Sequence, residues 1–168
     1  MGTSGDSGLA VTTPSDREIQ MTRVFDAPRE LVFEAMSSCE HMSNWWGPRR
    51  YEFASCEMDF RPGGSWRVVH HPIDGDGEDQ GFRGEFREIV PPERIVWTFE
   101  WEGMPGHISV ETLTLEEHDG KTTVTASATY DTVEDRDGML NSGMEEGAAE
   151  SYDRLDEYLE VLKGRASA

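Results

Sequence analysis

Two side chains in this sequence combine a reactive type with a place in a strand-like stretch: His70 and Glu111. His70 is followed by His71, and neighbouring strand residues point to opposite faces, so one ring is expected to face inward. An inward His70 could orient a polar ligand or act as an acid or base, although a structurally hydrogen-bonded histidine fits equally. Glu111 shares the parity of Leu113 and Leu115; if these point inward, it is a buried carboxyl with a raised pKa that could move a proton. A twist or bulge that turns Glu111 to solvent stays open, and no residue is assigned as catalytic.

Two acidic stretches invite comparison with metal sites, but neither has the spacing of one. Residues 74–79 read DGDGED, whereas an EF-hand loop has glycine at its sixth position, where Asp79 stands, and has helices rather than strands on either side. Residues 116–119 lie at a turn and lack the spacing of zinc ligands. The sequence also contains no P-loop, dinucleotide fingerprint, G-x-S-x-G or paired Cys–His motif. We therefore expect neither a metal nor a cofactor.

A helix period runs along residues 137–163, and its apolar side changes size halfway. The later positions of the stripe are bulky and typical of a core, whereas the earlier ones are small: Gly143, Gly147, Ala148 and Ser151. Each glycine inside a helix costs about 1 kcal/mol relative to alanine. Residues with low helix propensity and small side chains on this face predict free space beside the helix. We interpret this space as a ligand cavity. Close packing of the helix backbone against a strand is the alternative.

The elements that must hold these residues follow from alternation and turn signals. A strand over 17–25 precedes a helix opened by residues 26–28 and a second short helix over 39–44, which ends at Trp45-Trp46-Gly47-Pro48. Further strands are predicted over 51–60, 65–71, 80–90, 94–101, 108–116 and 122–130, with an Asp-Gly hairpin turn before the last. Sequential hairpins imply an antiparallel sheet. We expect an α+β fold in which a curved sheet of about seven strands surrounds the long C-terminal helix.

Alternate positions of the strands supply the walls of the expected cavity, because they share one face of the sheet. That face is rich in aromatic residues, and the last strand adds the small residues Ala126 and Ala128. The predicted ligand-binding residues are Trp66, His70, Phe82, Phe86, Trp97, Phe99, Trp101, Glu111, Gly143, Gly147, Ala148 and Ser151. An ordinary aromatic core is the alternative interpretation, and a bulge would invert the parity of a strand.

Composition restricts the partners. The chain of 168 residues has 34 acidic and 15 basic residues and a formal charge of −19. Such a surface repels nucleic acid phosphates and anionic membranes, so we expect no binding to either. No apolar stretch of about 18 residues is present, so no membrane span is expected. A small molecule remains the expected partner, with a protein partner possible.

The N-terminal residues and the cysteines indicate a cytoplasmic location. Residues 1–16 have neither a basic nor an apolar region typical of a secretory signal, and their Gly, Ser and Thr content predicts a disordered tail before a domain over 17–164. Cys39 and Cys56 form no C-x-x-C pair, so we expect both to be reduced and at least half-buried.

The order of elements resembles the START-like (SRPBCC) superfamily with its helix-grip fold. Motifs similar to that superfamily lie at residues 25–33, 45–48, 56–64, 84–98 and 143–147. Together they resemble the bacterial branch related to the C-terminal domain of the activator of the ninety-kilodalton heat-shock chaperone ATPase. Such relatives usually carry tryptophan after the glycine that matches Gly147, where this chain has Ala148. If this position faces the sheet, the cavity has lost an indole of roughly 200 Å² of buried surface.

Three functions are open at this stage. The first is binding of a small, largely apolar or aromatic molecule between the sheet and the C-terminal helix, without catalysis. The resemblance also implies two others: a cyclase or dehydratase acting on a polyketide-like or aromatic substrate, with His70 and Glu111 as candidate groups, and a protein-interaction module of the stress response that resembles the chaperone activator.

Overall fold

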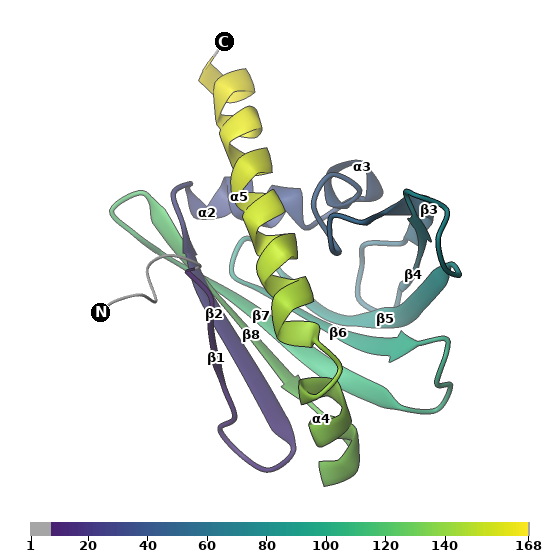
Figure 1. The fold of residues 1–168 in the computed structure, drawn as a ribbon. Helices are drawn as coiled ribbons and strands as arrows, with labels where there is room; N and C mark the ends of the chain where they lie inside the picture. Colours follow the sequence, from purple (N-terminus) through teal and green to yellow (C-terminus); the bar gives the residue numbers. More distant parts are fainter. Residues whose placement is uncertain (1–7, 168) are drawn as a thin grey trace.

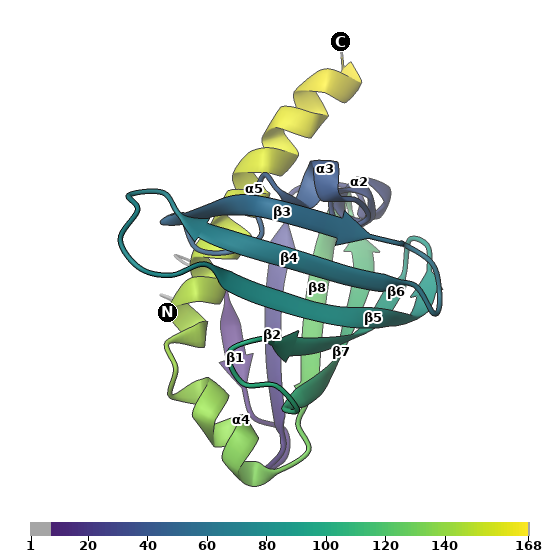
Figure 2. The ribbon, with the colours of Figure 1, turned by 90° about the vertical axis from the view of Figure 1, so that its right-hand side faces the viewer.

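The central feature of the fold is an eight-stranded antiparallel sheet that curves around a long C-terminal helix (Figures 1 and 2). The computed structural model describes residues 8–167. In chain order the elements are β1 (Ala10–Thr12), β2 (Glu18–Phe25), α2 (Arg29–Ala35), α3 (Cys39–Met42), β3 (Tyr51–Met58), β4 (Ser65–Pro72), β5 (Gln80–Val90), β6 (Arg94–Trp101), β7 (Ile108–His118), β8 (Lys121–Thr129), α4 (Val133–Leu140) and α5 (Met144–Ser167). The strand order is β1-β2-β8-β7-β6-β5-β4-β3. The helix-grip prediction is confirmed, with a slightly higher strand count.

Strand alternation determines what faces α5. On β4, Trp66, Val68 and His70 are buried, while Arg67 and His71 between and beyond them are exposed. On β8 the buried residues are those of the predicted parity, Ala126 and Ala128 included. The period of two therefore places an apolar face against the helix and a charged face toward water, as half-buried strands require.

The expected single helix over 137–163 is wrong at its start. The chain forms α4 and α5 with a break at residues 141–143, and Gly143 has a positive φ of 85°. A left-handed residue ends a helix, and Asn141-Ser142-Gly143 is a sequence signal for such an end that the apolar period had masked. Figure 1 shows α4 turning away at the foot of α5, so only α5 spans the sheet.

Residues 10–12 correct the expectation of a disordered tail over 1–16. They form β1, which pairs with β2 in the register Ala10↔Thr22 and Thr12↔Gln20. This pairing provides hydrogen-bond partners for the backbone of β1 and β2. Composition alone does not predict such pairing, because it depends on the backbone and not on the side chains. Residues 1–7 lie outside the described part of the chain.

The two cysteines are also placed differently from expectation. Cys39 and Cys56 form a disulfide that joins the start of α3 to β3, with a Cα–Cα distance of 5.8 Å. The prediction of reduced cysteines is wrong because it rested on local spacing, whereas the fold brings together two residues 17 positions apart. One of the two grounds for a cytoplasmic location therefore falls away, since disulfides are rare in the cytosol.

Within residues 8–167, no helix is long and apolar enough to cross a membrane.

Removing the disulfide is expected to lower the free energy of unfolding. A cross-link over a 17-residue separation stabilises by about 3 kcal/mol through chain entropy, so the C39S/C56S variant should lose about that amount in urea denaturation. Reductant should weaken the parent protein equally and leave the variant unchanged. Two titratable thiols in the denatured, unreduced parent protein would contradict the assignment.

Candidate functional site

A cavity of about 310 Å³ lies between the concave face of the sheet and the first half of α5. Its walls combine aromatic residues from the sheet, methionines and the small residues of the helix. Nine of the twelve predicted binding residues line it: His70, Phe82, Phe86, Trp97, Phe99, Glu111, Gly147, Ala148 and Ser151. The small half of the helical stripe therefore does border a space, and a side chain added at Gly147 would meet only Pro48.

Three predicted binding residues lie outside this cavity. Trp66 is buried behind the wall, where it stacks on Trp97 at 4.5 Å and donates from Nε1 to the carbonyl oxygen of Thr98 at 3.1 Å. Trp101 is 38% exposed near the end of β6, because the face that it shares with Phe99 continues beyond the helix. Gly143 lies in the break before α5, with no atom near the position of a side chain.

Trp46 is the largest contributor among the wall residues that the sequence pattern does not predict, since its ring contacts six other aromatic residues. Its ring lies among the aromatic residues of the sheet, with centroids 5.2 Å from His70, 5.5 Å from Phe82 and 6.2 Å from Trp97. It fills part of the concave face but leaves the space beside Ala148. Adjacent Trp45 is anchored differently, because its Nε1 donates to the carbonyl oxygen of Ala35 at 2.9 Å. The Trp45-Trp46-Gly47-Pro48 motif was interpreted only as the end of a helix, although two large apolar residues in a loop can indicate insertion into a core.

Gly47 is required at its position for two reasons. Its φ is +104°, a conformation that favours glycine, and a Cβ there would lie 2.5 Å from Cε1 of His70. The loop backbone thus packs directly against the imidazole. His70 is 4% exposed, and its Nε2 has no hydrogen-bond partner within residues 8–167.

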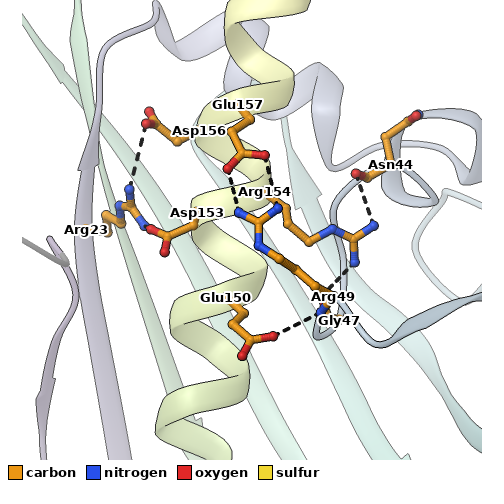
Figure 3. Close-up of polar contacts among 9 residues, drawn as sticks. All are labelled: Arg23, Asn44, Gly47, Arg49, Glu150, Asp153, Arg154, Asp156 and Glu157. Carbon is orange, nitrogen blue, oxygen red and sulfur yellow. Dashed lines mark hydrogen bonds and ion pairs between the residues drawn. The ribbon is translucent and has the colours of Figure 1, made fainter. Parts of the chain in front are cut away.

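Polar contacts fasten this loop to α5 (Figure 3). Ser151 Oγ accepts from the amide of Gly47 at 3.0 Å and donates to the carbonyl oxygen of Trp45 at 3.3 Å. Arg154 donates to the carbonyl oxygens of Gly47 at 2.8 Å and Asn44 at 3.4 Å. Ser151, predicted as a cavity wall, therefore also positions the loop that carries Trp46.

Ion pairs hold α5 from both sides. Arg49 pairs with Glu157, while its amide donates to Glu150 Oε1 at 3.0 Å. On the opposite side of the helix, Arg23 of β2 contacts Asp153 at 2.6 Å and, more weakly, Asp156 at 3.9 Å (Figure 3). The helix is thus tied to the loop before β3 and to β2, which lie on either side of the cavity.

Burial shifts the pKa values of His70 and Glu111, two of the titratable groups that line the cavity, in opposite directions. Desolvation and then the positive charge of Arg154 lower the pKa of His70 to about 4, so this imidazole is neutral at pH 7. Burial raises the pKa of Glu111, against the effect of Trp97, whose Nε1 donates to Glu111 Oε1 at 2.9 Å. Burial, followed by the charge of Glu111, also raises the pKa of the phenols of Tyr130 and Tyr152. Glu111 lines the cavity, which is the first of the two orientations that the sequence leaves open.

Two further spaces adjoin the cavity. A side chamber of about 490 Å³ shares Phe82 and Phe99 with it and extends along Trp101 and Met104 to α4. A recess of about 90 Å³ shares Glu111 with the cavity and extends to Tyr130. Glu111 therefore lies where the cavity and the recess meet. In the described part of the chain, no group of three or more His, Cys, Asp or Glu residues is placed to hold a metal ion.

Comparisons with known proteins give a family and a fold. The family model described as "Activator of Hsp90 ATPase homolog 1-like protein" matches residues 26–160. A crystal structure of a Rhodobacter sphaeroides protein shares 25% identity over 91% of this chain and 99% of its own, with a TM-score of 0.84. A Nitrosomonas europaea protein shares 24% identity over 89% and 98%, with a TM-score of 0.78.

A more distant likeness is to CalU16 from Micromonospora echinospora, at 21% identity over 94% of this chain and 87% of that one, with a TM-score of 0.61. At this identity the likeness concerns the fold. A comparison with curated proteins finds no match.

The lowered pKa of His70 predicts a loss of stability in acid. The unfolded chain binds a proton near pH 6.5 and the folded chain only near 4, so this stability is complete above pH 6.5 and is lost as the pH falls toward 4. The full difference is about 3 kcal/mol. His70→Gln should remove this part of the pH dependence of urea denaturation.

His71→Gln is the matched control for that measurement. His71 is exposed, and its hydrogen bond to Asp79 raises its pKa, so its small contribution has the opposite sign: it is present below pH 6.5 and is lost as the pH rises. Identical pH profiles for the two variants would contradict the burial of a neutral His70.

Arg154 is expected to hold the loop more strongly than Arg49 does. Arg154→Met removes charge-assisted hydrogen bonds to loop carbonyls and should cost about 2 kcal/mol of unfolding free energy. Arg49→Met removes an exposed ion pair and should cost less than about 1 kcal/mol. Amide hydrogen exchange at Trp45–Gly47 should accelerate in the first variant only; equal effects of both would contradict the assignment.

Proposed function

This chain belongs to the family of activator of Hsp90 ATPase homolog 1-like proteins, and from that premise we propose that it binds a small, largely apolar or aromatic molecule between the sheet and α5. Its fold is known for binding small hydrophobic ligands. The cavity of about 310 Å³ carries the proposal, because its volume is at the lower end of the range of ligand sites. Aromatic residues, methionines and few polar groups line it, as such sites require.

Ala148 supports the proposal from the helix. It lies on α5 at the cavity wall, next to Gly147. The family resemblance implies a tryptophan at this position in relatives, and an indole here would project into space that is free in this chain. The proposed ligand would take up the volume that a side chain fills elsewhere.

A cyclase or dehydratase acting on a polyketide-like or aromatic substrate is the second candidate. One observation favours it: Glu111 lies at the cavity, burial raises its pKa, and a carboxyl so placed is a candidate acid or base. Mutation of Glu111 and His70 would have to abolish turnover of an identified substrate for this candidate to hold.

The family description supports a third candidate, a module that binds a heat-shock chaperone. A chaperone pull-down together with an ATPase assay tests it, and no capture and no stimulation would exclude it. The disulfide removes the argument from reduced cysteines for a cytoplasmic location.

Filling the space at Ala148 is expected to abolish ligand binding. The uncharged fluorescent probe N-phenyl-1-naphthylamine should bind the parent protein, and Ala148→Trp should weaken its binding at least about tenfold, or 1.4 kcal/mol, because the indole takes the same volume. Kd is measured by fluorescence titration, and folding is checked by circular dichroism.

Val161→Trp is the control, since it adds the same side chain to the same helix at a residue that is 49% exposed. This variant should bind the probe as the parent protein does. No binding to the parent protein, or equal binding to all three proteins, would contradict the proposed site.

A further inference from the structure

The charged side chains that line the cavity, the side chamber and the recess are all acidic among the described residues. Glu111 lines the cavity and the recess, and Glu134 and Asp135 line the side chamber. Among the described residues that line these three spaces, none is a lysine or an arginine. His70 is neutral at pH 7, and His107 at the side chamber is 2.8 Å from Asp135. An anionic ligand would find no countercharge on these walls.

Glu111 has spare capacity for hydrogen bonds. Trp97 Nε1 donates to its Oε1, and no other hydrogen bond to this carboxyl is formed within residues 8–167. A carboxylate accepts about four hydrogen bonds, and one buried without a cation costs free energy. Glu111 is half-buried and borders the cavity, so its remaining hydrogen-bonding capacity is available to a ligand there.

The surroundings of Glu111 also suit a cation. The carboxylate lies close enough to Tyr130 and Tyr152 to raise the pKa of both phenols, and neither hydroxyl has a hydrogen-bond partner in the described structure. Each can accept a hydrogen bond. Trp97 and Phe99 add aromatic faces to the same cavity, and such faces attract organic cations.

We propose that the ligand of this cavity is an aromatic or apolar amine whose protonated nitrogen binds Glu111. The inference rests on the proposed function and narrows it to one class of ligand, the organic ammonium ions. The apolar part lies against the aromatic walls and the small residues of α5, and the ammonium group donates hydrogen bonds to the carboxylate. The formal charge of −19 favours the approach of such a cation.

Three probes with one skeleton test this proposal: 2-naphthylmethylamine, 2-naphthylmethanol and 2-naphthoate, which are cationic, neutral and anionic at pH 7. Isothermal titration calorimetry should give a Kd for the amine at least about tenfold below that of the alcohol, and no binding of the naphthoate. The Glu111→Gln variant keeps an oxygen for Trp97 Nε1 but loses the charge. It should bind the amine at least about tenfold more weakly and the alcohol within about twofold of the parent protein.

Glu134→Gln is the matched control, because it removes the same charge from the side chamber rather than from the cavity. It should leave the amine affinity within about twofold of the parent value. Equal Kd values for amine and alcohol in the parent protein would overturn the inference, and so would an unchanged amine affinity in a folded Glu111→Gln variant. The comparison of the amine with the alcohol on the parent protein tests the preference for an ammonium ion even if the Glu111→Gln variant does not fold.

The outcome also separates this inference from the proposed function. Binding of N-phenyl-1-naphthylamine without any preference for the amine would leave the cavity as an apolar ligand site and reject the ammonium ligand. Failure of the parent protein to bind any of the four probes would reject both.

Discussion

The insertion of Trp46 into the concave face of the sheet is the contact on which the rest of the interior depends. The indole lies edge-on to several aromatic rings of β4, β5 and β6, an arrangement that aromatic pairs favour beyond simple burial. It closes one part of the space between sheet and helix, and the remaining part is the cavity. The loop that carries Trp46 must therefore be held firmly, and Ser151 and Arg154 of α5 hold it by its backbone.

Small residues make this arrangement possible. Gly47 allows the loop to pack against the ring of His70, and Gly147 and Ala148 keep the facing side of the helix free of bulk. A helix with large residues in this half would fill the space as it fills the core around Leu155 and Leu159. The same helix thus does two things along its length: it completes the core with its later turns and leaves a cavity beside its first turns.

The electrostatics of the cavity follow from the burial of His70 and the partial burial of Glu111. Burial favours the uncharged form of both His70 and Glu111, so the cavity contains an imidazole that resists protonation and a carboxyl that resists ionisation. A charged group on a ligand would shift the protonation of Glu111 or His70. This effect is stronger in the cavity than it is for an ion pair on the exposed surface.

Local patterns in the sequence are enough to predict the strands from β2 to β8, their inward faces and the small residues at the start of α5. Alternation and turn residues encode these features over a few neighbouring positions, and so Phe82, Trp97, Glu111 and Ala148 could be placed at a cavity before the fold was seen. The place of Trp46, the Cys39–Cys56 disulfide and the hydrogen bond from Arg154 to Gly47 follow from the folded structure alone. Each joins residues distant in the chain, and such contacts leave no periodic trace in either segment. The break before α5 is an intermediate case. The sequence contains a helix-end signal there, but the apolar period continues across it and predicts one helix. The left-handed conformation of Gly143 in the folded chain shows that the helix ends.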